Sequence, residues 1–213
     1  MTSPAIRRYV AIGDSLSEGF SNWGRDERSI GFAQILADQI RVLVPTLEFH
    51  NLGVSGARTA GVLHRQAERA VALRPDLLTL VLGANDVPRT SIEHFRRDYL
   101  TLLDRLRSGI GGLILAANVP RFAHLLPPQY AAFRIPLRRR IEAFNRIIAE
   151  AAASHDVLLV DLHSSDVPED PRNVSGDGFH PNARGYRAMA GAFAEVLNHA
   201  GFEVAAPMLD SPP

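Results

Sequence analysis

The sequence predicts a single α/β domain of three layers (α/β/α), in which helices cover both faces of a five-stranded parallel sheet. Two observations support this prediction. Short, almost continuous apolar runs recur along the 213 residues, as is typical of strands that are buried on both faces. Between these runs, apolar residues return every three or four positions, which indicates amphipathic helices. Alternating strands and helices build parallel sheets with right-handed crossovers, and we expect the flavodoxin-like strand order 2-1-3-4-5.

Five apolar runs are the predicted strands. They cover residues 9–12, 47–52, 77–82, 113–117 and 157–162. The second run differs from the others because Glu48 and His50 alternate with apolar residues. Alternation of this kind indicates that one face of a strand meets solvent. We therefore expect the second strand at a more exposed edge of the sheet.

Four connecting segments have the periodicity of helices with one buried face. The last of them follows Asn182, a residue type that caps helix N-termini well. The predicted inward-facing residues are, in chain order, Phe32, Ile35, Leu36, Ile40 and Leu43; Phe95, Leu102, Leu103 and Leu106; Leu137, Ile141, Phe144 and Ile148; and Tyr186, Met189, Phe193, Val196 and Leu197.

No internal repeat or domain boundary is visible, so we expect one domain over residues 1–213. The proline-rich stretch 120–136 is predicted to be an irregular loop that could roof a site. Residues from about 203 to 213, which end in Asp-Ser-Pro-Pro, are expected to form a frayed tail.

Composition excludes several classes of function. The basic and the acidic residues each number 23, every basic one is Arg, and Cys is absent. Without Lys there is no P-loop nucleotide site, Schiff base or Ser–Lys dyad, and without Cys there is no thiol nucleophile or Cys-based zinc site. The near-zero net charge argues against nucleic acid as a partner. A nucleophilic enzyme built from this chain must use oxygen, and we expect it to need no cofactor or metal.

The chain shows no targeting signal. Its first eight residues, Met-Thr-Ser-Pro-Ala-Ile-Arg-Arg, contain no long apolar run, and no segment has eighteen uninterrupted apolar residues. We therefore expect neither a signal peptide nor a membrane span, and a cytoplasmic location.

Residues that could take part in catalysis follow the predicted strands. The stretches 13–16 (Gly-Asp-Ser-Leu), 53–56 (Gly-Val-Ser-Gly) and 83–86 (Gly-Ala-Asn-Asp) come directly after the first three strands, and 176–180 (Gly-Asp-Gly-Phe-His) precedes the last helix. The carboxyl ends of parallel strands meet at one edge of a sheet, where ligands bind. The sequence therefore predicts one site assembled from these four stretches.

Ester hydrolysis needs a nucleophile, a base and donors for the developing oxyanion. Ser15 lies on a strand-to-helix turn, and Asp177 and His180 are three residues apart on a Gly-containing loop, where the acid can orient the imidazole. Gly56 and Asn85 offer an N–H and an amide donor. Each residue also has a purely structural interpretation, as a helix cap or a turn residue. The combination at one sheet edge is what favours catalysis.

The four stretches resemble the four sequence blocks of the GDSL or SGNH hydrolases. Asp177-Gly178-Phe179-His180-Pro181-Asn182 is similar to the last block, and the order and spacing cover nearly the whole chain. The resemblance implies that Ser15 is the nucleophile, His180 the base and Asp177 the acid. It also implies an oxyanion hole made by the N–H groups of Ser15 and Gly56 and the side chain of Asn85.

Two positions in the blocks differ from the family pattern or allow more than one assignment. The second block offers both Gly53 and Gly56, and the family pattern assigns the donor to Gly56. Ala84 stands where many members have a second Gly, a change that the neighbouring Asn85 should tolerate. Asp14, within the first block, is expected to support the site. The expected partner is a small-molecule ester, with short-chain acyl or acetyl esters among the candidates; the oligomeric state is left open.

Three other functions compete with ester hydrolysis. An acyltransferase would use the same site with an alcohol in place of water. A metal-dependent, phosphate-handling enzyme would gather the acids and histidines near the strand ends, which are Asp14, Asp86, Asp161, His163, Asp177 and His180. Leu16 stands where a haloacid-dehalogenase-like enzyme needs a second Asp, which weighs against that version. A binding module with the same fold but no activity has no support, because every expected catalytic position is filled.

Overall fold

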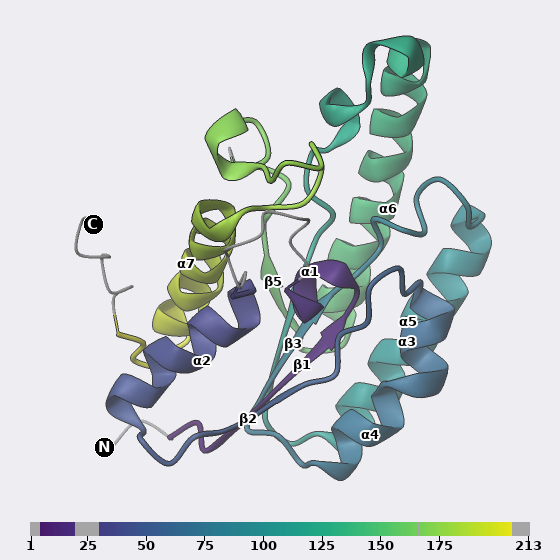
Figure 1. Cartoon of the computed structure of the whole chain (residues 1–213). Coiled ribbons are helices and arrows are strands. Elements are labelled where there is room, and N and C mark those ends of the chain that lie inside the picture. The colour runs from purple at the N-terminus through teal and green to yellow at the C-terminus, as the bar shows by residue number, and fades with distance from the viewer. Residues whose placement is uncertain (1–4, 20–29, 166, 206–213) are drawn as a thin grey trace.

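A computed structural model describes residues 5–19, 30–165 and 167–205, and its strands form one five-stranded parallel sheet (Figure 1). The observed order is β2-β1-β3-β4-β5, which confirms the predicted fold class and topology. The strands are β1 (Arg8–Gly13), β2 (Glu48–Asn51), β3 (Leu77–Val81), β4 (Leu113–Ala117) and β5 (Leu158–Val160).

Three predicted strands are longer than the observed ones. The prediction of 47–52 is corrected to 48–51, 77–82 to 77–81, and 157–162 to 158–160. Leu47, Val157 and Leu162 are all buried although they lie outside the paired strands. An apolar run indicates which residues are buried, and the buried residues extend beyond the last residue that pairs with a neighbouring strand. The edge position predicted for β2 is correct, because β2 pairs only with β1 and its residues are exposed or half-buried.

Helices cover both faces of the sheet (Figure 1). On one face lie α2 (Phe32–Leu43) and α7 (Ala183–His199), and on the other lie α3 (Thr59–Arg65), α4 (Ala67–Ala72), α5 (Ile92–Gly109) and α6 (Arg134–Ser154). The remaining helical turns are α1 (Ser15–Glu18) and the 3-10 turns η1 (Ala123–Leu125), η2 (Pro128–Phe133) and η3 (Pro171–Asn173). The short helices α3 and α4 were not among those predicted.

The strands divide the core into two halves because successive side chains point to opposite faces. Val10 and Ile12 pack under α3 to α6, whereas Tyr9 and Ala11 face α2 and α7. Phe32 of α2 stacks on Phe193 of α7, with ring centroids 4.6 Å apart. These packed helices hold the sheet rigid, so the turns at its carboxyl edge have fixed positions.

Most of the residues predicted to face inward from the helices are buried. Leu43 is 48% exposed and is the last residue of α2. Ile35, Leu137 and Val196 are only partly buried, although they pack against the core. Asn182 caps α7 as predicted, since its Oδ1 accepts the Gly185 N–H at 3.1 Å. Of the predicted tail, residues 206–213 lie outside the described residues, and 203–205 form neither helix nor strand.

Candidate active site

Ser15 lies on a sharp turn between β1 and α1. Gly13 has φ +136°, and a Cβ there would lie 1.9 Å from the Val81 carbonyl oxygen, so only glycine fits. Asp14 then caps α1, because its Oδ1 accepts the Leu16 N–H at 3.0 Å. Ser15 is thus the first residue of the helix rather than its cap, and its N–H has no acceptor among the described residues.

Gln66 holds this turn from the far side. Its Oε1 accepts the Gly13 N–H at 2.8 Å, and its Nε2 donates to the Gly13 carbonyl at 2.9 Å. The side chain is almost completely buried between α3 and α4. Such a two-point contact fixes the peptide groups beside Ser15. This contact was not predictable, because a lone Gln between two short helices belongs to no motif.

His180 connects Ser15 to Asp177. The imidazole Nε2 lies 3.0 Å from the Ser15 Oγ, and its Nδ1 lies 2.6 Å from the Asp177 Oδ2. The turn brings the pair together because Gly178 adopts φ +72° and donates its N–H to the Ser175 carbonyl. All three predicted residues therefore form one continuous hydrogen-bonded chain.

Asp177 is held in its ionised form. Partial burial would raise its pKa, but hydrogen bonds outweigh this effect and lower the pKa to about 2. The donors are His180 through its ring, the Ser175 hydroxyl, and the N–H groups of Phe179 and His180. A carboxylate at neutral pH keeps the proton of the imidazole on Nδ1, which leaves Nε2 as the acceptor for the Ser15 hydroxyl.

The second block forms a tight turn beside α1. The Ala57 N–H donates to the Val54 carbonyl at 3.0 Å, and Gly56 takes φ +75° at the third position of this turn. Both the N–H and the hydroxyl of Ser55 donate to the Glu18 carboxylate. This contact ties the turn to the helix that carries Ser15.

The two glycines of this block differ in their surroundings. Gly53 donates its N–H to the Asn51 side chain at 3.0 Å and packs so closely on α1 that a Cβ would lie 2.6 Å from the Glu18 nitrogen. The Gly56 N–H has no acceptor within the described part of the chain. Gly53 is thus a packing residue, and Gly56 is the one with a free donor.

Asn85 joins three of the four stretches. Its Nδ2 donates to the Ala57 carbonyl at 3.1 Å and lies 3.5 Å from the Asp14 Oδ2. The residue follows β3 on a turn that begins at Gly83, whose carbonyl accepts the Asp86 N–H at 2.9 Å. The amide therefore lies between the turn of Gly56 and the turn of Ser15, as the predicted site requires.

Two buried acids lie beneath these turns. Asp14 is 1% exposed, and burial raises its pKa to about 7, with the nearby charge of Asp86 acting in the same direction. Burial also raises the pKa of Asp86, although the backbone and hydroxyl of Thr59 and the hydroxyl of Thr90 donate to its carboxyl group. Asp14 thus titrates near neutral pH, directly next to Ser15.

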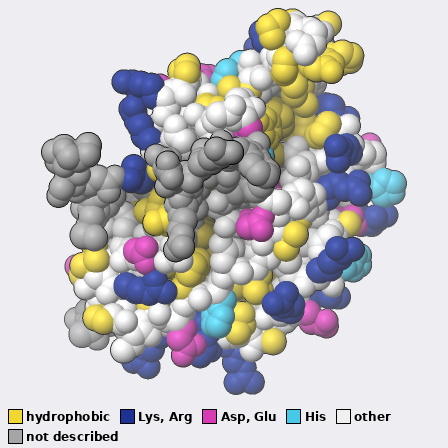
Figure 2. Space-filling model, in the orientation of Figure 1, with side chains coloured by type: hydrophobic (Ala, Val, Ile, Leu, Met, Phe, Trp, Pro, Cys, Tyr) yellow, Lys and Arg dark blue, Asp and Glu magenta, His cyan; other side chains and the backbone are white. Residues whose placement is uncertain are grey.

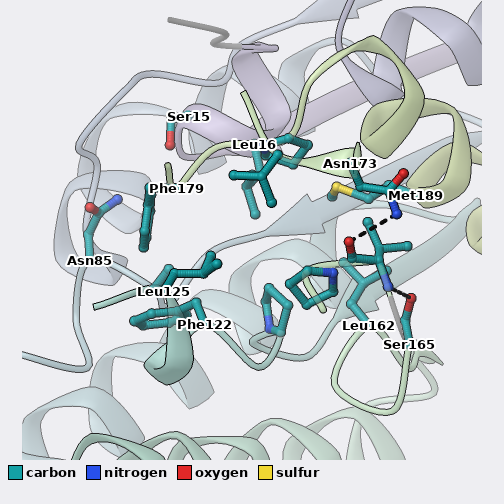
Figure 3. A pocket seen from close by; sticks show the side chains of 16 residues that line it. Ser15, Leu16, Asn85, Phe122, Leu125, Leu162, Ser165, Asn173, Phe179 and Met189 are labelled. Atoms are coloured by element: carbon teal, nitrogen blue, oxygen red, sulfur yellow. Dashed lines mark hydrogen bonds between the residues drawn. The ribbon is translucent and has the colours of Figure 1, made fainter. Parts of the chain in front are cut away.

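A small, mostly apolar cavity of about 50 Å³ opens beside Ser15. In Figure 3, Ser15, Asn85 and Phe179 lie at one end of it, and Leu162, Asn173 and Met189 lie at the other. The side chains that line it further include Leu16, Phe122, Leu125 and Val167. None of its lining residues is ionisable, so the cavity suits an uncharged apolar group.

The stretch 120–136 is more ordered than the irregular loop predicted for it, because it contains η1, η2 and the first turn of α6. Only its first part reaches the cavity, through Pro120, Phe122 and Leu125. Tyr130 and Phe133 instead line a separate groove and are largely exposed. In Figure 2, apolar side chains (yellow) gather at the top of the molecule, over the N-terminal end of α6 and the segment before it.

The acids and histidines near the strand ends do not assemble as the metal-dependent alternative requires. Among the described residues, no group of three or more His, Asp or Glu side chains is close enough to share a metal ion. His163 contacts the backbone of Val119 instead, and Asp161 accepts a hydrogen bond from Asn118. Nor does any helix within the described ranges combine the length and apolar character needed to cross a membrane.

Residues 11–188 match the model of the GDSL-like lipase/acylhydrolase family. The chain belongs to this family. The match spans all four stretches that form the site, and it makes the protein an esterase- or lipase-type hydrolase that acts on ester bonds, as the motifs predicted. An inactive binding module is accordingly the weaker interpretation.

Several known proteins resemble the chain over most of its length. An acetylxylan esterase of Geobacillus stearothermophilus is 26% identical, with 92% of this chain and 94% of that protein covered. Esterase TesA of Pseudomonas aeruginosa is also 26% identical, with 83% and 81% covered. Among solved structures, the acetylxylan esterase Axe2 of G. stearothermophilus superposes with a TM-score of 0.71 at 21% identity, covering 93% of this chain and 96% of that one. The α/β hydrolase LAE5 from the Lake Arreo metagenome gives the same TM-score and identity, with 90% and 95% covered.

Proposed function

We propose that the protein hydrolyses short-chain carboxylic esters through an acyl-enzyme on Ser15. The observation that carries this proposal is the hydrogen-bonded chain from the Ser15 Oγ to His180 at 3.0 Å and from His180 to Asp177 at 2.6 Å. Both distances lie within the range in which a base can take a proton from a nucleophile and be oriented by an acid.

The first half of the reaction transfers the acyl group to the enzyme. The Ser15 Oγ attacks the ester carbonyl carbon, and its proton moves to the His180 Nε2. The resulting imidazolium is stabilised by Asp177, which stays ionised because its pKa is about 2. When the tetrahedral intermediate collapses, the C–O bond to the alcohol breaks, and His180 gives the proton to the leaving oxygen.

Three donors stabilise the oxyanion of this intermediate. They are the N–H groups of Ser15 and Gly56 and the side-chain amide of Asn85. The support is that neither N–H has an acceptor among the described residues, and that Asn85 and Ser15 line the same cavity. Donors that are already oriented need no rearrangement as charge develops, which is how such groups lower a barrier. This applies to the two N–H groups, whereas the Asn85 amide has to give up its long 3.5 Å contact with Asp14 to donate to the oxyanion.

The second half of the reaction releases the carboxylic acid product. Water attacks the acyl carbon while His180 takes one of its protons, and the bond to the Ser15 Oγ breaks as His180 returns that proton to the serine. Ser15, His180 and Asp177 are then in their starting states. The steps balance without any group from outside the chain except the ester and water.

The short acyl group is inferred from the cavity. A cavity of about 150 Å³ holds benzene, which has six heavy atoms, whereas the cavity beside Ser15 measures about 50 Å³. On this scale it accommodates about two heavy atoms, the size of an acetyl or propanoyl tail. The similarity to an acetylxylan esterase is consistent with this size class.

Replacing Ser15 tests the proposal directly. The Ser15→Ala variant should lose about 10⁴- to 10⁶-fold in kcat on p-nitrophenyl acetate while its melting temperature stays close to that of the wild type. Ser91→Ala is the matched control, because Ser91 caps α5 and does not line the cavity beside Ser15; it should keep full activity. Retention of wild-type activity by Ser15→Ala would exclude Ser15 as the nucleophile.

A further inference from the structure

The cavity beside Ser15 lies on one side of the bond that the proposed reaction breaks. His180 gives its proton to the leaving oxygen, so the alcohol must lie beside the imidazole. The neighbours Phe179 and Pro181 line the cavity, but His180 itself does not. Ser15 and Asn85, which contact the acyl carbonyl in the proposed reaction, do line it. The cavity is therefore on the acyl side of the nucleophile.

An acyl tail bound to Ser15 points from the end of the cavity that contains Ser15 and Asn85 toward the opposite end. Figure 3 shows Leu162, Asn173 and Met189 at that opposite end. All three residues are more than nine-tenths buried. A tail that is longer than the cavity therefore meets packed side chains at this end rather than solvent.

One of these three residues has a structural role in its own segment. The Asn173 Nδ2 donates to the Val167 carbonyl at 3.0 Å, and the Asn173 carbonyl accepts the Asn182 N–H at 2.9 Å. Leu162 and Met189 have apolar side chains and come from different elements, the segment after β5 and the helix α7. They are thus the two apolar walls that an acyl tail would reach.

Met189 forms its wall from a helix that is fixed in place. Tyr186 lies one turn before it on α7 and Phe193 one turn after it, and both are fully buried. Phe193 also stacks on Phe32 of α2. Methionine is unbranched and fills irregular gaps in cores. Because the helix is held on both sides of Met189, the end of the cavity depends on the length of this side chain.

We propose that Met189 sets the longest acyl group that the enzyme accepts, with Leu162 as the second wall. This inference rests on the function proposed above and adds to it a residue that determines specificity. On the scale of known cavities, the present cavity takes a tail of about two heavy atoms. Truncating Met189 at Cβ frees the space of its Cγ, Sδ and Cε atoms, about 75 Å³ on that scale. The enlarged cavity accommodates about five heavy atoms, the tail of a hexanoyl group.

The test is the acyl-length profile of Met189→Ala, measured as kcat/KM for p-nitrophenyl esters from acetate to octanoate. Each methylene that gains an apolar wall should raise kcat/KM about fourfold. Neighbouring side chains relax into part of the freed space, so the ratio of hexanoate to acetate hydrolysis should rise at least about tenfold over the wild type. Met189→Val frees less space and should shift the ratio by a smaller factor. Leu162→Ala should shift it in the same direction as Met189→Ala.

Leu197→Ala is the matched control. Leu197 lies two turns after Met189 on α7, belongs to the same half of the core and does not line the cavity. Its truncation should lower the melting temperature as Met189→Ala does, but its acyl-length profile should equal that of the wild type. A second series, acetyl esters of alcohols of increasing size, should be unchanged in Met189→Ala because the alcohol lies outside the cavity.

Three outcomes would overturn the proposal. One is an unchanged acyl-length profile in both Met189→Ala and Leu162→Ala while they remain folded and active on acetate. Another is a shift in the alcohol series rather than the acyl series, which would assign the cavity to the leaving group. The last is an equal shift in Leu197→Ala, which would attribute the change to a loosened core. None of them bears on the role of Ser15, since that role depends on the Ser15→Ala measurement alone.

Discussion

Replacing Asp14 by Asn should change how the stability of the protein depends on pH. Asp14 is buried next to Ser15, and burial raises its pKa to about 7 from an ordinary value of 3.8. Asparagine has nearly the same shape and is an equally good helix cap. Its Oδ1 can still accept the Leu16 N–H that Asp14 accepts now. The substitution therefore removes the titration while keeping the turn.

The direction follows from proton linkage. Because the folded-state pKa is higher than the unfolded one, folded chains keep a proton on Asp14 between about pH 4 and pH 7 that unfolded chains have released. Asp14 therefore contributes stability that is fully present below about pH 4 and is lost as the pH rises to about 7. Each pKa unit corresponds to about 1.4 kcal/mol. The difference between 3.8 and about 7 thus amounts to about 4 kcal/mol in the free energy of unfolding.

The assay is urea unfolding of wild type and Asp14→Asn at several pH values from about 4 to 8. The free energy of the variant relative to the wild type should increase by about 4 kcal/mol across this range. Asp170→Asn is the control, since its hydrogen bonds with Arg172 lower the pKa of Asp170 to about 2. Its difference from the wild type should be constant over the same range. If the curves of Asp14→Asn and wild type stay parallel, Asp14 is ionised throughout and the argument from burial is wrong.

Three further predictions concern the site and its turns. Asp177→Asn should lower kcat about 10⁴-fold, because an amide can hold His180 in the wrong tautomer; a loss below tenfold in steady-state assays would contradict the role of the acid. Asn85→Ala should lower kcat by about 10² to 10³ with little change in KM, and an effect on KM alone would argue against an oxyanion donor. Gly13→Ala should cost at least about 3 kcal/mol in urea unfolding, since its Cβ would overlap a β3 carbonyl. The control Gly61→Ala, where a Cβ meets open space on α3, should be neutral or stabilising.

The sheet was predictable because its strands are buried on both faces. Continuous apolar runs mark such strands, and the rule that ligands bind at their carboxyl edge pointed to the site. The strand ends were less predictable, since Leu47 and Val157 are buried without being paired. The helices α3 and α4 were missed because each has only six or seven residues, too few to establish a helical period.

The groups that carry chemical reactivity could be predicted, but those that fix their geometry could not. Ser15, Asp177 and His180 are reactive residue types at recognisable spacings. Gln66 and Phe122 have no reactive role, and only the folded chain brings them against Gly13 and Phe179. A single sequence contains no pattern that pairs residues so far apart, because such contacts depend on how helices pack on the sheet rather than on local periodicity.

These supporting contacts explain why a site drawn from four separate stretches can be rigid before substrate binds. Each turn has its own fixing group: Gln66 holds the first, Glu18 the second and Ser175 the last. Asn85 links the first turn to the second. An error of about 1 Å in a reacting group can reduce a rate about 10²-fold, so we expect these contacts to matter to the rate although none of the three fixing groups lines the cavity beside Ser15. The catalytic role proposed for Ser15 is therefore expected to depend on residues that no catalytic motif contains.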